Sequence, residues 1–225
     1  MQGGKRRPVA KLFMQWRDQA RKDGPGDLPG PAPRVWGILS GEAETVHPDG
    51  EKILLDRHTI ARRVAEMGRQ ISLDYAGREI VAVGILKGAT MFLADLVRAI
   101  SVPVYLDFVA TSSYGSAARS SGEVRILKDL DESIADRHVL LVEDIVDSGL
   151  TLNYLCANLS ARGPASLRIC TLLNKPSRRV VSVGVDYTGF DIPDEFVVGY
   201  GLDWAGHHRS LPYIMILRRD VYAGS

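Results

Sequence analysis

Short apolar runs alternate along the chain with segments in which apolar residues recur every three or four positions. Runs at residues 79–85, 102–109, 138–142 and 167–173 predict buried strands. Apolar residues at helical spacing follow the first and third of these runs, and another such segment follows Asp56, a residue type that caps helices. Strands and helices in alternation indicate an α/β fold with a doubly wound, mainly parallel sheet.

The stretch 139–151 reads Val-Leu-Leu-Val-Glu-Asp-Ile-Val-Asp-Ser-Gly-Leu-Thr and joins a strand to a helix. Gly149 lets the backbone come close to a ligand, and the N–H groups at a helix N-terminus form an anion site. Ser148 and Thr151 add hydroxyl donors. In an open α/β sheet ligands bind where strands end and helices begin, so this turn is a candidate phosphate site.

Three carboxylates crowd the same turn. Glu143 and Asp144 follow the apolar run directly and Asp147 comes three residues later, so a bare phosphate would be repelled. The conflict disappears if the carboxylates face sugar hydroxyls and a divalent cation while the amides face the phosphate. Phosphoribosyl diphosphate carries all of these groups, and Asp147 is then placed to exchange a proton with an acceptor base.

The stretch resembles the phosphoribosyl-diphosphate motif of the type I phosphoribosyltransferases, in which four apolar residues precede two acids and Asp-Ser/Thr-Gly-x-Thr. Leu150 departs from members that carry Lys or Asn there. No G-x-x-x-x-G-K-S/T loop competes with it, and Gly199 and Gly201 lack a third glycine because Trp204 stands in its place.

The segment 192–203, with Trp204 and Arg209 after it, resembles the hypoxanthine-guanine phosphoribosyltransferases, and the likeness runs from about residue 55 to residue 217. It implies a small hood of flanking segments, Mg²⁺, and a homodimer or homotetramer. The implied catalytic residue is Asp147 and the implied metal ligands are Glu143, Asp144 and Asp203. The residues expected to bind substrate are Lys87, Gly88, Ser113, Tyr114, Glu143, Asp144, Ser148, Gly149, Leu150, Thr151, Lys175, Phe196, Val197 and Arg209.

Lys175 bears on the substrate class. The resemblance implies that it bonds the purine 6-oxygen while Phe196 stacks on the ring and the backbone of Val197 reads the base edge. An ammonium group has donors and no acceptor, so it favours a 6-oxo group over the 6-amino group of adenine. Hypoxanthine, guanine and xanthine stay open as substrates.

Two loops complete the expected site. Lys87 and Gly88 follow a strand and are expected to contact the diphosphate. Residues 112–122 show no periodicity, and loops of this length are usually functional or disordered. This loop, with Ser113 and Tyr114 matching a Ser-Tyr pair of the family, is the candidate lid that excludes water.

Composition and charge restrict the remaining possibilities. The 225 residues are 45% hydrophobic with a net charge of +1, so no nucleic-acid partner is expected. No apolar run approaches the roughly 20 residues of a membrane span, and the two cysteines fall in predicted core elements, which favours a reduced, cytoplasmic protein. Residues 1–50 are predicted to form a basic extension with a Gly/Pro-rich linker, and residues 51–225 the transferase domain.

Two alternatives stay open. Val9, Leu12, Phe13 and Trp16 fit one face of a short basic helix that could meet a membrane surface or a partner, although a frayed tail is favoured. A regulator that senses phosphoribosyl diphosphate without turning it over would need only the 139–151 motif. His207 and His208 are adjacent and no third His or Cys lies near them in the sequence, so they are expected to be structural or solvated rather than metal ligands.

Overall fold

The protein has a six-stranded main sheet and a separate three-stranded sheet, called the hood, which is formed by other stretches of the chain. The computed structural model describes residues 45–113 and 124–223. In the six-stranded main sheet the strand order is β4-β3-β2-β5-β6-β7, and β3–β4 is its antiparallel pair while the other pairs are parallel. Its strands are β2 (Ile80–Leu86), β3 (Val104–Ser113), β4 (Val124–Lys128), β5 (His138–Val146), β6 (Ser166–Asn174) and β7 (Tyr187–Asp191). The predicted doubly wound, mainly parallel sheet is confirmed.

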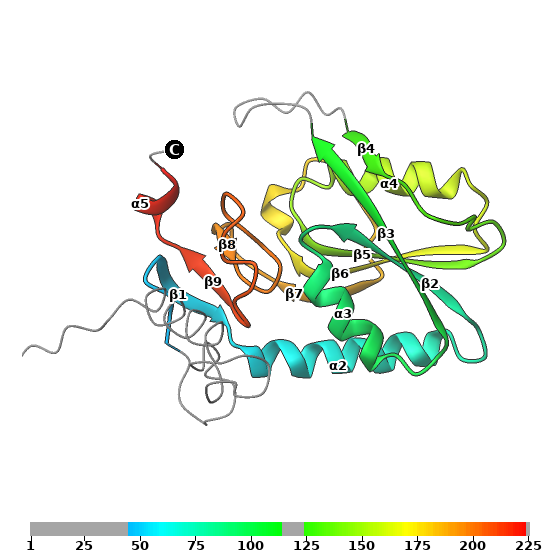
Figure 1. Ribbon diagram of the computed structural model, residues 1–225, viewed down its shortest axis with the longest axis horizontal. Coiled ribbons are helices and arrows are strands. Elements are labelled where there is room, and N and C mark those ends of the chain that lie inside the picture. The colour runs from blue at the N-terminus through cyan, green and yellow to red at the C-terminus, as the bar shows by residue number, and fades with distance from the viewer. Residues whose placement is uncertain (1–44, 114–123, 224–225) are drawn as a thin grey trace, which may run out of the picture. The chain divides into compact units, whose positions relative to one another are not determined.

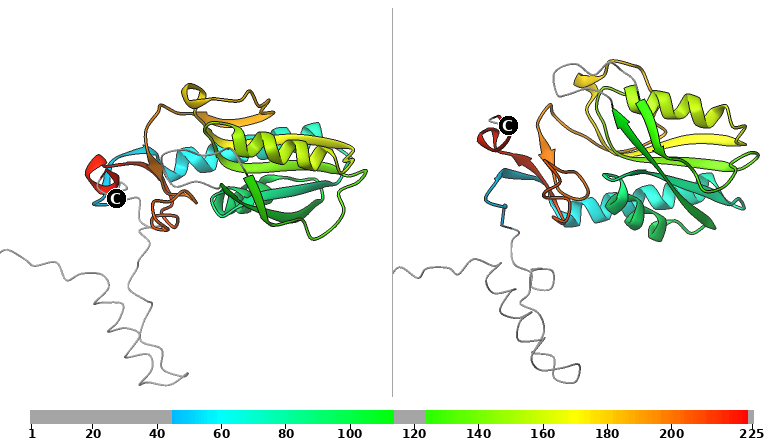
Figure 2. Two further views of the ribbon diagram at one scale, coloured as in Figure 1. Left: turned by 90° about the horizontal axis from the view of Figure 1, so that it is seen from above. Right: turned by 45° about the horizontal axis from the view of Figure 1, so that its top comes forward.

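Alternation of side chains along the central strands builds two cores. Ala82 on β2 and Leu140 on β5 pack against helices α2 (Arg57–Asp74) and α3 (Thr90–Ala99). Val83 and Leu141 point the other way, toward α4 (Leu150–Ser160). Helices therefore cover both faces of the sheet (Figure 1), as a second view confirms (Figure 2).

Helix α2 begins where the sequence indicated. Asp56 is its N-cap, and its Oδ1 accepts hydrogen bonds from the backbone N–H groups of His58 and Thr59 at 2.9 and 2.8 Å. The predicted buried face of Ile60, Val64, Met67 and Ile71 is confirmed. In the described part of the chain, no helix has both the length and the apolar character that crossing a bilayer requires.

The hood is a small antiparallel sheet of order β1-β9-β8, made of β1 (Gly50–Leu55), β8 (Val197–Val198) and β9 (Ile214–Leu217), followed by helix α5 (Arg219–Tyr222). It lies beside one end of the main sheet (Figure 1). One face of the hood, with Val197 and Ile216, joins the core under α2, and the other face, with Val198 and Met215, packs around Tyr213 and Leu217. The hood brings residues from both ends of the domain together. The division at residue 50 stays a prediction, and the basic helix expected before it lies outside the described residues.

Strands β2 and β6, which flank β5, stop pairing with it at different residues. Its pairing with β2 ends at Gly84↔Val142, whereas its pairing with β6 continues to Val146↔Asn174. Glu143 and Asp144 therefore lie inside β5, not just after it as the apolar run suggested. They still stand beyond the last residue that β2 covers, so their side of the strand is open to a ligand.

Candidate active site

The phosphate turn lies between β5 and α4. Gly149 has φ +84°, and a Cβ there would come within 2.7 Å of the Val181 carbonyl oxygen, so only glycine fits. The Ser148 carbonyl ties the turn to the segment after β6, because it accepts hydrogen bonds from the N–H groups of Val180 and Val181 at 3.0 and 3.1 Å. The turn and the first turn of α4 line a pocket of about 270 Å³, and the N-terminus of a helix offers free amides to an anion. Its lining residues are Ile85, Thr111, Glu143, Asp144, Ile145, Val146, Asp147, Ser148, Gly149, Thr151 and Leu152.

The acidic pair forms one wall of this phosphate pocket. Glu143 is only 9% exposed, and burial together with the neighbouring Asp144 raises its pKa well above the ordinary value. The carboxylates also bond their own strand, since the Asp144 N–H donates to Glu143 Oε1 at 3.3 Å and the Ile145 N–H donates to Asp144 Oδ1 at 3.0 Å. These two N–H groups belong to the part of β5 that β2 no longer pairs.

We expect Glu143→Gln to stabilise the ligand-free protein at alkaline pH. With its pKa raised in the folded state, Glu143 binds a proton more tightly there than in the unfolded chain, so stability falls as pH rises above the unfolded value near 4.5. Gln carries no charge to bury. The melting temperature at pH 8 should rise by about 2–4 °C per kcal/mol recovered, and little change is expected at pH 4. Calorimetry of both proteins across this range measures it, and an equal shift at both pH values would contradict the burial argument.

A second pocket of about 430 Å³ adjoins the first. It is lined by Ile145, Asp147, Lys175, Arg178, Asp194, Glu195, Phe196, Val197, Leu202, Asp203, Arg219 and Tyr222. Ile145 and Asp147 line both pockets, so Asp147 stands at their common wall. Lys175, 8% exposed, donates from Nζ to the Glu195 carbonyl at 2.7 Å and keeps further N–H donors.

Phe196 forms an aromatic wall of this second pocket. Its ring stacks on Tyr222 at 4.9 Å between centroids with 23° between the planes, and Trp204 meets it edge-on at 5.3 Å. Hood strands fix its backbone, since the Phe196 carbonyl accepts from the Leu217 N–H at 2.8 Å and Val197 pairs with Ile216 in β8–β9. The pocket thus combines a flat apolar wall with one buried cation.

The sequence did not indicate Arg178, Asp194 or Tyr222. Arg178 sits 3.3 Å from Asp147 through Nε and 3.6 Å from Asp194 through Nη1, and therefore bridges two acids of the second pocket. Its place three residues after Lys175, in the turn that follows β6, is the only signal that could have drawn attention to it. Tyr222 reaches the pocket from α5, near the end of the described chain, and no motif marks it.

The turn after β2 lies against the acidic pair. The peptide bond between Leu86 and Lys87 is cis. A Cβ on Gly88 would come within 1.7 Å of Asp144 Oδ2, and a Cβ on Gly201 would come within 2.0 Å of the Gly88 carbonyl oxygen. Three segments that are distant in sequence are therefore in close contact at this point, and both contacts require glycine.

Asp203 and Arg209 form an ion pair with each other. Arg209 Nη2 lies 2.5 Å from Asp203 Oδ1, and Arg209 Nη1 donates to the Gly201 carbonyl at 2.5 Å. Asp203 Oδ2 accepts from the Gly206 N–H at 2.6 Å. The pair joins the loop that touches Gly88 to the wall of the second pocket.

The expected lid is only partly described. Ser113 is the last residue of β3, whereas Tyr114 and the rest of residues 114–123 lie outside the described residues. Leu150 begins α4, and among the described lining residues of the two pockets it is absent. Its role in substrate binding stays a prediction.

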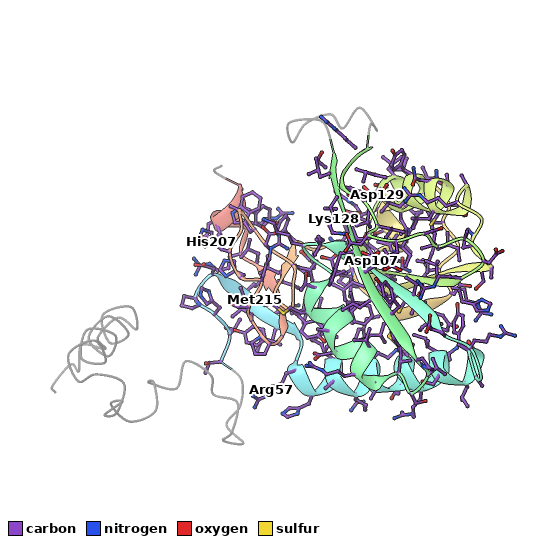
Figure 3. The ribbon with its side chains drawn as sticks, turned by 45° about the vertical axis from the view of Figure 1, so that its right-hand side comes forward. Arg57, Asp107, Lys128, Asp129, His207 and Met215 are labelled. Carbon is purple, nitrogen blue, oxygen red and sulfur yellow. The ribbon has the colours of Figure 1, made fainter. Side chains whose placement is uncertain are left out.

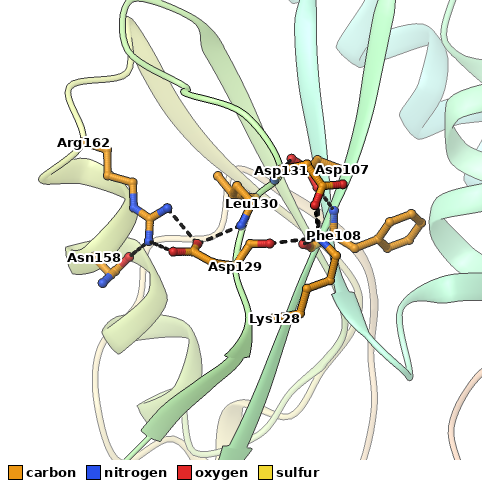
Figure 4. A network of polar contacts seen from close by, with 8 residues as sticks. All are labelled: Asp107, Phe108, Lys128, Asp129, Leu130, Asp131, Asn158 and Arg162. Atoms are coloured by element: carbon orange, nitrogen blue, oxygen red, sulfur yellow. Dashed lines mark hydrogen bonds and ion pairs between the residues drawn. The ribbon is translucent and has the colours of Figure 1, made fainter.

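A polar network around the buried Asp107 connects strands β3 and β4 (Figure 4). Asp107, 3% exposed, accepts from the N–H groups of Phe108 and Asp131 at 2.6 and 3.0 Å. Lys128 Nζ donates to Asp131 at 3.0 Å and to the Phe108 carbonyl at 3.0 Å, which ties β4 back to β3. Next to it, Arg162 binds both oxygens of Asp129 at 2.7 and 3.0 Å.

Comparison with known proteins agrees with this geometry. Residues 50–204 match the family model described as a phosphoribosyl transferase domain. The chain is 50% identical over 192 residues to the hypoxanthine-guanine phosphoribosyltransferase of Mycobacterium tuberculosis, covering 82% of this chain and 95% of that protein. It is 52% identical over 165 residues to the hypoxanthine phosphoribosyltransferase of Haemophilus influenzae, covering 72% and 92%.

A solved structure agrees as well. The crystal structure of a hypoxanthine phosphoribosyltransferase from Staphylococcus aureus superposes with a TM-score of 0.75 at 45% identity, covering 77% of this chain and 95% of that one. The fold, the arrangement of the acidic pair beside the phosphate turn and these matches lead to one conclusion: the chain belongs to the hypoxanthine(-guanine) phosphoribosyltransferases of the phosphoribosyltransferase family.

Proposed function

We propose that this chain transfers the 5-phosphoribosyl group from phosphoribosyl diphosphate to hypoxanthine, guanine or both, and so acts in purine salvage. The products are the nucleoside 5′-monophosphate and diphosphate. The observation that carries the proposal is the common wall of the two pockets at Asp147. One pocket offers backbone amides to a phosphate and the other offers Lys175 and an aromatic wall to a base, so the C1′ atom of a bound ribose would come between them.

The phosphate pocket receives the 5′-phosphate in this proposal. The N–H groups of the Ser148–Gly149 turn and the first amides of α4 bind its oxygens, with the hydroxyl groups of Ser148 and Thr151 as further donors. Leu150 would take part only through its backbone. Glu143 and Asp144 accept hydrogen bonds from the ribose hydroxyls on the open side of β5, which would release the two amides that they occupy in the ligand-free chain.

The donor set fits Mg²⁺. The cation prefers carboxylate oxygens and phosphate oxygens, and Glu143, Asp144 and Asp203 supply carboxylates at the edge of the two pockets. Gly88 lets the turn after β2 lie directly against the Asp144 carboxylate, because a Cβ there would come within 1.7 Å of Asp144 Oδ2. When bound, Mg²⁺ supplies charge neutralisation for the leaving diphosphate.

Protein cations and amides bind the diphosphate on the same side. We propose that the Lys87–Gly88 turn donates to it through the backbone and through the Lys87 ammonium group. Arg209 would exchange its contact with Asp203 for a diphosphate oxygen, and this frees the Asp203 carboxylate for the cation. Binding of the diphosphate and the cation would thus separate the ion pair of Asp203 with Arg209.

Catalysis in this proposal depends on positioning and on charge. The base approaches C1′ from the second pocket, and Asp147 accepts or returns the proton at purine N7. The carboxylates around the sugar stabilise the cationic ribosyl transition state, and no covalent intermediate with the enzyme is required. Water must be kept out during this step, and we propose that the segment containing Ser113 and Tyr114 does so.

Lys175 sets the preference for a 6-oxopurine. Lys175→Gln should lower kcat/KM for hypoxanthine by about 10–100-fold, because a hydrogen bond from a charged donor is lost. Discrimination against adenine should fall at the same time, since an amide offers both a donor and an acceptor. Steady-state rates with hypoxanthine, guanine, xanthine and adenine measure both effects. Lys52→Gln, an exposed lysine of β1, is the matched control. If Lys175→Gln discriminates against adenine as strongly as the parent enzyme does, Lys175 does not set the preference for 6-oxopurines.

The same assay tests the proposed function against the sensing alternative. A regulator would bind phosphoribosyl diphosphate but turn over none of the four bases, whereas the family relatives are named as transferases. Two further proposals accompany this one. The chain acts in the cytoplasm, supported by two free cysteines, and it assembles into a homodimer or homotetramer, as the resemblance implies.

A further inference from the structure

A cluster of three potential metal ligands lies on the hood, outside the two pockets of the proposed reaction. His47, Asp49 and His208 bring one ligand atom each to within 4.8 Å of one another. A cavity of about 490 Å³ adjoins them, and His207 also lines it. Figure 3 labels His207 on the hood, away from Asp107 in the main sheet. No third His or Cys lies near the paired histidines in the sequence, but the fold brings His47 and Asp49 from the start of the domain to His208.

A tight turn places two of the three ligands side by side. His47, Pro48, Asp49 and Gly50 form a turn that is closed by a 2.8 Å hydrogen bond from the Gly50 N–H to the His47 carbonyl. Proline in the second position and glycine in the fourth are typical of such turns. The Asp49 N–H donates to His47 Nδ1 at 3.2 Å, and a metal ion bound to this nitrogen would take over its lone pair from that N–H group. Asp49 Oδ2 is 3.6 Å from the same nitrogen.

The third ligand comes from a loop whose backbone is held in place. Ala205 and Gly206 both have positive φ, at 49° and 83°, between Trp204 and His207, which pair with each other as in a two-residue hairpin. His208 follows with φ +73°, and its side chain is 9% exposed. This conformation directs the imidazole at the turn, where His208 Nε2 lies 3.3 Å from Asp49 Oδ2 and the rings of His47 and His208 are 4.9 Å apart.

We propose that His47, Asp49 and His208 bind a divalent transition-metal ion of the zinc type. With metal–ligand bonds of about 2.0–2.2 Å, neighbouring ligand atoms of a tetrahedral site lie roughly 3.3–3.5 Å apart. The two distances from Asp49 Oδ2, 3.3 and 3.6 Å, are close to this spacing. Two imidazoles and one carboxylate suit zinc and its neighbours, whereas Mg²⁺ and Ca²⁺ prefer oxygen ligands alone. The cavity that these residues line leaves room for a fourth ligand such as water.

The bound ion would act as a staple within the hood. It would connect the turn before β1 to the loop that carries Asp203 and Arg209, segments that now meet through the 3.3 Å contact of Asp49 Oδ2 with His208 Nε2. The His47 and Asp49 side chains are 37% and 39% exposed, so an ion can enter and leave from solvent. This site is separate from the magnesium carboxylates of the proposed reaction, and excess Mg²⁺ should not displace its ion.

Titration of the metal-stripped full-length chain with Zn²⁺ in the presence of excess Mg²⁺ tests the proposal. We expect one ion per chain by competition with a chromophoric chelator, together with a rise in melting temperature. With Co²⁺ in place of Zn²⁺, we expect the intense visible absorption of a four-coordinate site. Asp49→Asn, His47→Leu and His208→Asn should each weaken binding by about 100-fold or more, since even outer-shell changes cost 10–100-fold. Asn at position 208 tolerates the left-handed backbone.

His58→Ala is the matched control, because His58 is an exposed histidine of α2 that lies outside the cluster. Its affinity should equal that of the parent chain. Melting curves without metal show whether each variant folds. If a histidine variant fails to fold, the zinc affinity of Asp49→Asn, which conserves the shape of the side chain, tests the proposal. Zinc affinity that survives in Asp49→Asn, or that falls equally in His58→Ala, would overturn the proposal, as would the absence of stoichiometric binding.

Discussion

Asp147→Asn should lower kcat by about 10²–10⁴-fold, the range that a positioned acid–base group contributes. Asparagine keeps the shape of the side chain at the common wall of the two pockets but cannot take up a proton. Binding of phosphoribosyl diphosphate should persist, since the amides and hydroxyls of the phosphate turn are untouched. Single-turnover rates together with calorimetric binding of phosphoribosyl diphosphate separate the two effects.

Asp194→Asn provides the matched control for this measurement. Asp194 lines the second pocket, the one that contains Lys175, and contacts the same Arg178 at 3.6 Å. It does not line the phosphate pocket. Its loss should change kcat far less than the loss of Asp147. Similar losses in both variants would mean that Asp147 acts through Arg178 and the charge balance of the pocket, and an unchanged rate in Asp147→Asn would reject the proton role.

Gly88→Ala should raise KM for phosphoribosyl diphosphate by about 100-fold or more, an effect of the size expected when a site group moves by about 1 Å. The added Cβ would lie 1.7 Å from Asp144 Oδ2, so either this carboxylate or the turn after β2 must move. Both are expected to meet the sugar and the diphosphate. Initial rates at varied phosphoribosyl diphosphate and fixed base concentration give the KM.

Gly184→Ala adds the same methyl group where no atom lies within 4 Å and should leave KM unchanged. Melting temperatures of both variants distinguish a displaced site from a damaged fold. A Gly88→Ala protein with the parent KM would show that the turn relaxes without moving Asp144. The contact would then carry no information about substrate binding.

The sequence predicted those features of the fold that are determined by residues close to one another in the chain. The run 139–142 and the turn that follows it predicted strand, glycine turn and helix together, because β5, the glycine at 149 and α4 each follow from neighbouring residues. The helix cap at Asp56 and the buried face of α2 could be predicted for the same reason, because both depend on residues that are close in the sequence. Lys175 was predicted to reach the site because it directly follows a strand, and parallel strands end at the same edge of a sheet.

Contacts between distant segments could not be predicted in this way. The hood joins β1 to β8 and β9 across almost the whole domain, and its strands of 2–6 residues are too short to show a period. The approach of Gly201 to Gly88, the bridge that Arg178 forms between two acids and the meeting of His47 with His208 all depend on this packing. The sequence also could not show that β5 extends past Glu143, because its length is set by pairing with β6.

The early departure of β2 from β5 has a consequence for how the enzyme responds to its substrate. Beyond Val142 the strand has a free edge, and there the acids bond the N–H groups of Asp144 and Ile145 themselves. The two acids that we propose bind the ribose are therefore already hydrogen-bonded to N–H groups of their own strand. In that proposal the sugar hydroxyls would compete with these N–H groups for the carboxylates, and the N–H groups would regain their partners once product leaves.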